Sequence, residues 1–141
     1  MLGSGSKLWS AVYATSGVVS TSDARVKTNL RPIPSGLGTL LKLQPLTYFK
    51  HKSHFENGAV VIENDGAEEA GFIAQEVSGI IPTAVHRPED ESKMLWGMRT
   101  DQVIPYTVKA VQELKVENDA LRTELETMKA ELAEIKALLK R

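Results

Sequence analysis

Ser22 and Lys27 are the residues whose types and spacing point most directly to chemistry. A serine five residues ahead of a lysine can serve as a nucleophile, with the lysine as its general base. The amine must first lose its proton, and a dry or positively biased site lowers the pKa of an amine far enough for that. The ordinary alternative is a solvated turn followed by an exposed lysine. The position of the pair gives it weight, since it lies where a β-like N-terminal stretch gives way to a globular segment.

The chain itself is the favoured target of this pair, because no glycine-rich pocket loop and no second catalytic cluster is visible. Attack by Ser22 on the carbonyl carbon of Thr21 passes through a five-membered ring and gives an ester that water can hydrolyse. Attack on its own carbonyl needs a strained four-membered ring. We therefore expect scission of the Thr21–Ser22 bond for attack within one chain, whereas attack between chains leaves the Ser22–Asp23 bond open.

Two histidines, His51 and His54, have a spacing that can chelate a metal, with Glu56 nearby. Loop histidines beside lysines are more often solvated, and this is the favoured interpretation here. The acidic run over residues 63–69 lacks the ligand order of a calcium loop. The sequence therefore predicts no metal site and no cofactor.

The composition is that of a soluble globular protein with room for one domain and an extension: 141 residues, 42% apolar and 25% charged. Seventeen basic and eighteen acidic residues leave a net charge of −1, so no overall field points to nucleic acid or to an anionic membrane as a partner. The absence of cysteine excludes disulfides and thiolate sites. No apolar run approaches the roughly 20 residues of a membrane-spanning helix.

Four segments are expected along the chain. Residues 1–6 read as an expression scar joined to a fragment of something larger. Residues 7–21 are rich in β-branched and aromatic residues on both faces, and we expect them to be the end of a β-stalk upstream of the cleavage site. Residues 22–99 have the pattern of a small mixed α+β core. Residues 100–141 are expected to be a long C-terminal helix.

Within the core, the pattern predicts a short helix over 37–43 and a strand over 46–50. Residues 51–70 are polar and acidic and are expected to form an exposed hairpin or loop. Residues 71–77 read as a strand entering a short helix, and residues 94–98 as a last strand.

The C-terminal helix is expected to be capped by Thr100 or Asp101, with Pro105 in its first turn. Beyond it, residues recur every seven positions, with a second row three and four positions away. This is an a/d seam sustained over four heptads, which predicts a coiled coil. The seam consists of Val111, Leu114, Asn118, Leu121, Leu125, Met128, Leu132, Ile135 and Leu139.

Charges flank this seam in a regular way. Glutamates at the g positions face cations at the e positions of the next heptad in a parallel, in-register partner, so self-association is expected to be parallel. The seam does not select the number of strands, and Asn118 is expected to set the register. The alternative, one helix folded back on its own domain, does not account for the charges. The pairs are Glu117 with Arg122, Glu124 with Lys129, and Glu131 with Lys136.

Four motifs occur in the order shared by a known family: residues 19–29, 43–48, 71–77 and 110–114. Together they resemble the C-terminal intramolecular chaperone domain of bacteriophage tailspikes and tail fibres, the endosialidase-type self-cleaving domain. A related domain occurs in eukaryotic myelin regulatory factor proteins. The resemblance covers about residues 8–115.

The resemblance implies a homotrimer that nucleates folding of the upstream β-stalk and then cuts itself off. It makes Ser22 the nucleophile and Lys27 the general base of a Ser-Lys dyad. Asp23 and Arg25 match the same motif without an assigned chemical step. Residues 94–98 depart from the family pattern. A structural role is expected for the matching residues of the second motif, which are Gly71, Phe72, Gln75 and Glu76.

The function expected from these observations is a self-processing assembly chaperone, an enzyme in the single-turnover sense, with no external substrate. Its partners are copies of itself and the β-stalk of the same polypeptide, in a virion tail precursor within the host cytoplasm. Whether Lys27 serves the serine of its own chain stays open, as does the oxyanion hole. The main rival is a permanent trimerisation and stalk-capping module whose dyad is inert. A glycan-binding fibre tip would need an aromatic cluster, for which Trp9 and Trp96 are the main candidates.

Overall fold

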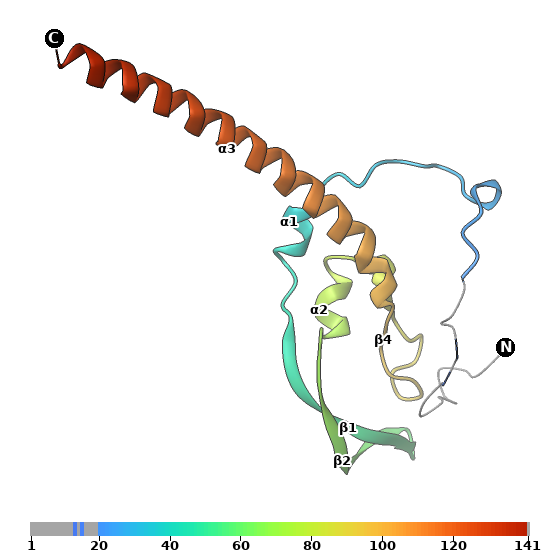
Figure 1. Ribbon diagram of the computed structural model, residues 1–141. Coiled ribbons are helices and arrows are strands. Elements are labelled where there is room, and N and C mark those ends of the chain that lie inside the picture. The colour runs from blue at the N-terminus through green and yellow to red at the C-terminus, as the bar shows by residue number, and fades with distance from the viewer. Residues whose placement is uncertain (1–12, 14, 16–19, 141) are drawn as a thin grey trace. The chain divides into compact units, whose positions relative to one another are not determined.

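The computed structural model describes residues 13, 15 and 20–140, and its fold is mixed α+β, as expected (Figure 1). Contacts divide the chain into two units. One joins Ile33–Lys42 to Asp101–Arg141, and the other holds Leu43–Thr100 with the residues before Ile33. The expected scar over residues 1–6 lies outside the described residues, and the expected β-stalk over 7–21 lies almost wholly outside them.

A two-stranded antiparallel hairpin dominates the second of these units. Strand β1 (Leu46–Glu56) pairs along its length with β2 (Ala59–Gly71). The loop between them has two residues, Asn57 with φ of 51° and Gly58 with φ of 78°. Positive φ at both positions is what a type I′ turn requires, and asparagine followed by glycine is the sequence that favours it. The Asn-Gly pair therefore sets where the hairpin turns.

The strands are longer than the sequence pattern predicted. The expected strand over 46–50 extends to residue 56, and the polar stretch over 51–70 is hairpin rather than loop. Its charged side chains pair across the strands, which supports regular pairing where the composition resembles a loop. The pairs are Lys50 with Glu69 at 3.3 Å, His54 with Glu63 at 3.0 Å, and Lys52 with Asp65.

A small apolar cluster follows the hairpin in the same unit. Val77, Ile81 and Ala84 are buried, and the backbone N–H of Arg99 donates to the carbonyl oxygen of Ala84 at 2.8 Å. The strand expected over 94–98 is wrong in its extent, because ladder pairing covers two of its residues. The elements are α2 (Ala74–Ser78), the 3-10 turn η2 (Pro82–Ala84), β3 (Val85–His86) and β4 (Gly97–Met98), the last two antiparallel.

The long helix of the other unit is α3 (Ile104–Leu138), preceded by the 3-10 turn η3 (Thr100–Val103). Pro105 lies in its first turn, as expected. The predicted cap is wrong: Thr100 and Asp101 belong to η3, and the α-helix begins after Val103 without a side-chain cap. Within the described residues, no helix is both long and apolar enough to cross a bilayer.

Helix α1 (Leu37–Leu40) packs against α3, and it is shorter than the helix predicted over 37–43. The contact depends on Gly36, since a Cβ there would lie 2.2 Å from the backbone nitrogen of Ala110. Ala110 itself is buried, at 3% exposure. Any larger residue at position 36 would push α1 away from the helix.

Candidate functional site

A tight local turn carries the first motif. The 3-10 turn η1 (Ala24–Val26) has Asp23 as its N-cap, and the Asp23 carboxylate accepts the backbone N–H of Arg25 at 2.8 Å. The backbone N–H of Lys27 donates to the carbonyl oxygen of Ala24 at 3.1 Å. The turn thus brings residue 27 back toward residue 22.

The two predicted dyad residues meet across this turn. Lys27 Nζ lies 2.6 Å from Ser22 Oγ and donates a hydrogen bond to it. This is the separation that a nucleophile and its general base require. For the lysine to act as a base, its amine must be uncharged, so that the hydroxyl donates instead. Both residues are exposed in the single chain.

Asp23 and Arg25 form a two-pronged ion pair beside the dyad. Arg25 Nε donates to Asp23 Oδ1 at 3.0 Å, and Nη2 donates to Oδ2 at 2.7 Å. The guanidinium, followed by the backbone N–H of Arg25, holds the pKa of Asp23 below its usual value, and the carboxylate raises the pKa of Arg25. The pair stays charged across the neutral range and links the two side chains within the turn.

The second motif lies at the open end of the hairpin and on α2. A Cβ at Gly71 would lie 2.7 Å from the Tyr48 hydroxyl oxygen, so a larger residue there would require the Tyr48 side chain to shift. Gln75 and Glu76 are exposed on α2. Within the described part of the chain, no hydrogen bond or ion pair joins this motif to Ser22 or Lys27. A hollow of about 490 Å³ is lined by Pro45, Leu46, Thr47, Ala70, Gly71 and Phe72.

The histidines considered as metal ligands both use Glu63. His51 Nδ1 lies 2.9 Å from the backbone oxygen of Glu63, and His54 Nδ1 lies 3.0 Å from its carboxylate. Over residues 13, 15 and 20–140, no three His, Asp or Glu side chains gather closely enough to hold a metal ion. Both histidines therefore have hydrogen-bonding partners within the hairpin.

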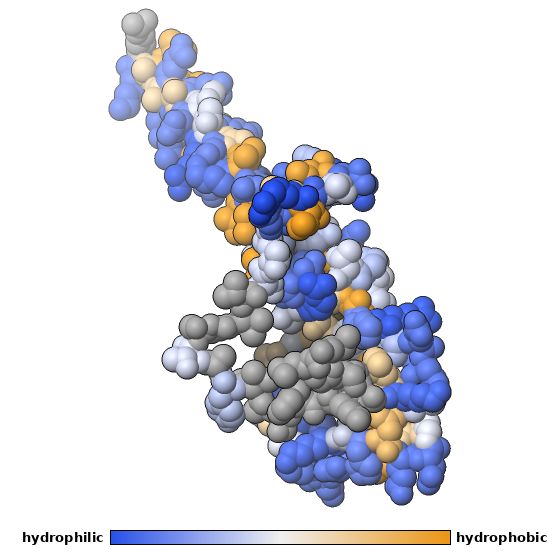
Figure 2. Space-filling view, turned by 90° about the vertical axis from the view of Figure 1, so that its right-hand side faces the viewer, coloured by the Kyte–Doolittle hydropathy of each residue, from blue (hydrophilic) through white to orange (hydrophobic). Residues whose placement is uncertain are grey.

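The predicted a/d seam of α3 is open to solvent in the single chain. Its apolar side chains range from 47% exposed at Leu114 and Leu125 to 81% at Leu139. Figure 2 shows apolar residues recurring among hydrophilic ones along this helix. An exposed apolar row of this length is typical of an interaction surface.

The residue before α1 contacts α3 away from this seam. Gly36 packs against the backbone of Tyr106, Lys109 and Ala110, which occupy the c, f and g positions of the heptad that precedes Val111. The contact of Gly36 thus lies at positions other than a and d. The sequence pattern did not predict this contact, which joins residues at least 70 positions apart.

Comparisons with known proteins identify a family that the residues around this site resemble. Residues 22–86 match the model of the family described as "Chaperone of endosialidase". The chain is 30% identical over 107 residues to the long tail fiber protein Gp37 of Enterobacteria phage M1, covering 75% of this chain and 40% of that protein. It is 29% identical over 109 residues to the corresponding protein of Enterobacteria phage Ox2, covering 77% of this chain and 41% of that protein.

A eukaryotic protein is also similar. The chain is 27% identical over 135 residues to the myelin gene regulatory factor-like A protein of Dictyostelium discoideum, covering 89% of this chain and 14% of that protein. The chain thus spans well under half the length of each of these relatives. The resemblance indicated by the motifs is confirmed, and residues 22–86 carry the sequence of the chaperone of endosialidase family.

Proposed function

We propose that this chain is an intramolecular chaperone domain that assembles as a parallel homotrimer, nucleates folding of an upstream tail-fibre or tailspike β-stalk, and then releases itself by autoproteolysis. Ser22 is the nucleophile and Lys27 the general base. The protein acts in a virion tail precursor in the host cytoplasm. The observation that carries the proposal is the 2.6 Å hydrogen bond between the two side chains, in a segment that matches the family.

The proposed chemistry is an acyl shift followed by hydrolysis. Lys27 takes the hydroxyl proton as Ser22 Oγ attacks the carbonyl carbon of Thr21. The C–N bond to Ser22 breaks, the nitrogen takes a proton, and the acyl group rests on Oγ as an ester. Water then cleaves the ester, leaving a carboxylate on Thr21 and a free amine on Ser22. In attack between chains, the Ser22–Asp23 bond remains the alternative.

Assembly supplies the environment that this step needs. The dyad is exposed in the single chain, and a lysine acts as a general base only in its uncharged form. Packing of neighbouring chains over the turn would exclude water and favour the uncharged amine. Cleavage therefore waits for the trimer, and a chain that has not assembled keeps its chaperone.

The exposed seam of α3 supports the assembly step. Parallel pairing buries its apolar residues and matches the g and e charges. Three linked chains then meet at roughly millimolar local concentration, which offsets much of the entropy cost of bringing distant stalk segments into register. Once the chaperone leaves, the stalk has lost its path back, and its stability becomes kinetic.

Intact mass measurement of freshly purified protein tests the proposal. The wild-type chain should yield a fragment that begins at Ser22 or Asp23, and the two differ by the mass of one serine residue. Ser22→Ala and Lys27→Ala should each remain whole, while Ser20→Ala, a matched change two residues upstream, should still be cut. Cleavage that persists in both dyad variants would remove the Ser-Lys dyad from the account.

The rival function is a permanent trimerisation module. The exposure of the dyad to solvent favours this rival if the turn stays exposed in the assembled protein. It predicts a trimer that stays whole indefinitely. Sizing and mass measurement on the same sample separate the two functions.

A further inference from the structure

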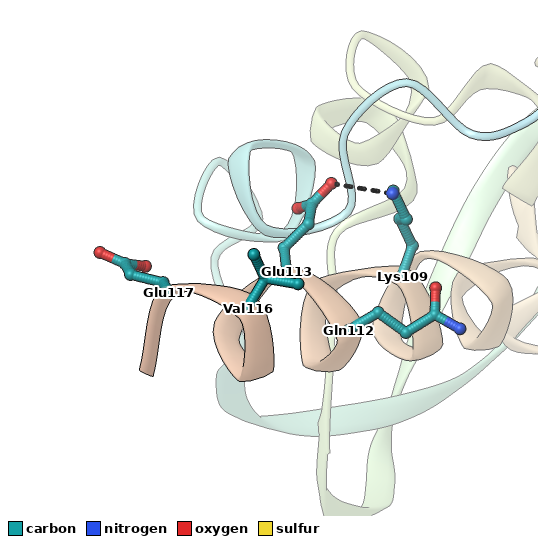
Figure 3. Close-up of a pocket in the computed structure, with 5 residues that line it drawn as sticks. All are labelled: Lys109, Gln112, Glu113, Val116 and Glu117. Atoms are coloured by element: carbon teal, nitrogen blue, oxygen red, sulfur yellow. Dashed lines mark ion pairs between the residues drawn. The ribbon is translucent and has the colours of Figure 1, made fainter. Parts of the chain in front are cut away.

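Glu113 of α3 holds the start of α1 by direct hydrogen bonds. Its carboxylate accepts the backbone N–H of Leu37 at 2.8 Å and that of Gly36 at 3.1 Å. Lys109 Nζ lies 3.7 Å from the same carboxylate, one helical turn earlier (Figure 3). We call the contact of Glu113 with Gly36 and Leu37 the latch.

The latch is specific to these positions. Glu113 is the less exposed partner of its ion pair, at 28% of its side chain, and bonds between a charged acceptor and backbone N–H groups are stronger than neutral ones. The backbone of residue 36 lies against α3 so closely that a Cβ would meet backbone atoms of Ala110, Lys109 and Tyr106 at 2.2 to 2.7 Å. Close backbone packing and charged hydrogen bonds thus hold Gly36 and Leu37 against α3.

The latch lies a short way along the chain from the dyad. Residues 28–35 separate Lys27 from Gly36, so the two Cα atoms are at most about 32 Å apart even when the chain is fully extended. Pro32 and Pro34 fix φ at their own positions and disfavour helix in the residues before them, which stiffens this link. The latch fixes a point in the segment between Lys27 and the hairpin. Fewer residues therefore have to become ordered to hold the dyad in place, which lowers the entropy cost of holding it.

We propose that Glu113 is a positioning residue for self-cleavage. It fastens the segment that follows the dyad to α3 and so couples the assembly of α3 to the positions of Ser22 and Lys27. This rests on the proposed function. Since the latch uses the c, f and g side of α3, it forms without occupying the a/d seam. Assembly and latching are therefore compatible, and removal of the latch leaves trimerisation intact.

The experiment compares Glu113→Ala with Glu134→Ala in the full-length chain. Glu134 has the same heptad position three heptads later and is exposed, so it matches the change in charge and helix propensity. Both variants should sediment as the wild-type oligomer. Glu113→Ala should cleave at least tenfold more slowly by intact mass, given the strength of hydrogen bonds to charged groups, and Glu134→Ala should cleave at the wild-type rate. Equal rates in the two variants would overturn the proposal.

A glycine pair gives an independent arm. Gly36→Ala should slow cleavage as Glu113→Ala does, because its Cβ meets helix backbone. Gly38→Ala is the control, since its Cβ would meet the rotatable Ser35 Oγ at 2.8 Å. Normal cleavage in Gly36→Ala would count against the latch.

Hydrogen exchange in the uncleavable Ser22→Ala chain separates this inference from the proposed function. Adding Glu113→Ala should speed exchange at least tenfold at the hydrogen-bonded amides of Gly36 and Leu37 and of the turn over residues 25–27, with the seam segment unchanged. If the wild-type chain never cleaves, the proposed function fails, yet this exchange pattern would still support the coupling. Unchanged exchange over residues 22–37 would overturn it.

Discussion

The turn that carries the dyad and the helix α3 are both unfinished in the single chain, but in different respects. The turn has its geometry, with Lys27 Nζ 2.6 Å from Ser22 Oγ, and it is exposed to water. The helix has a continuous backbone over Ile104–Leu138, and its apolar seam is exposed. The turn needs a dry environment for the proposed chemistry, whereas the seam of the helix needs partner chains for the proposed coiled coil.

The difference shows how assembly can control a reaction. The geometry of the dyad comes from six consecutive residues, because the Asp23 cap and the Arg25 ion pair lie within the same turn. In the proposed function, the dry environment of the dyad comes from the assembled chains. Such a site would have its geometry before assembly and would become active after it.

The largest effect is expected from breaking the seam. Leu125→Asp places a charge at an a position that the proposed coiled coil buries in each chain, and burying unpaired charges costs several kcal/mol each. The oligomer should fall apart to monomers at micromolar concentration in analytical ultracentrifugation. Ala133→Asp, an exposed b position on the same helix, is the control and should leave the oligomer intact. A Leu125→Asp variant that keeps the wild-type mass in solution would contradict the coiled coil.

A smaller effect is expected from loosening the turn. Arg25→Ala removes both side-chain bonds to Asp23 and leaves the Asp23 cap on the backbone N–H of residue 25. Cleavage should slow severalfold. Asp23→Ala removes the cap as well and should slow it by roughly tenfold, the scale of a lost helix cap. Arg31→Ala is the control. If both variants cleave at the rate of this control, the Asp23 cap and the Arg25 ion pair are not needed to hold the dyad.

The smallest effect is a pH dependence of the latch. The N–H of Leu37, then that of Gly36 and the Lys109 ammonium, hold the pKa of Glu113 below its usual value. A carboxyl with a depressed folded-state pKa contributes stability that is present above its unfolded pKa and is lost as pH falls through the folded value. In NMR spectra of the Ser22→Ala chain, the amide protons of Gly36 and Leu37 should hold their shifts from neutral pH down to the ordinary glutamate range. Below that range they should move together, and a shift change centred near neutral pH would contradict the assignment.

The helix was predictable because its signal repeats. Each heptad repeats the same a/d pattern, so one atypical residue such as Asn118 does little to weaken the prediction of a helix. The start of the helix was not predictable in the same way: Asp101 is a good cap by type, yet Pro105 lies in the first α-helical turn after a 3-10 turn, and no side chain caps it. The cap expected from residue type therefore lies earlier in the chain than the actual start of α3 at Ile104.

The hairpin was predicted in part, whereas the latch was not predicted. A hairpin was one of the two forms expected over residues 51–70. The length of its strands was not predictable, because cross-strand charged pairs such as Lys50 with Glu69 give the composition of a loop. The latch has no local signal, since Gly36 and Glu113 are far apart in the chain. The contact between Ser22 and Lys27 was predictable because the two residues lie five positions apart, within the reach of one turn.

Intact mass measured over time on the wild-type chain and on Leu125→Asp, side by side at the same concentration, tests the central claim most directly. The account predicts that the assembled wild type loses the residues before Ser22 or Asp23 while the monomeric variant stays whole. A variant that cuts as fast as the wild type, or an assembled wild type that is never cut, would contradict it.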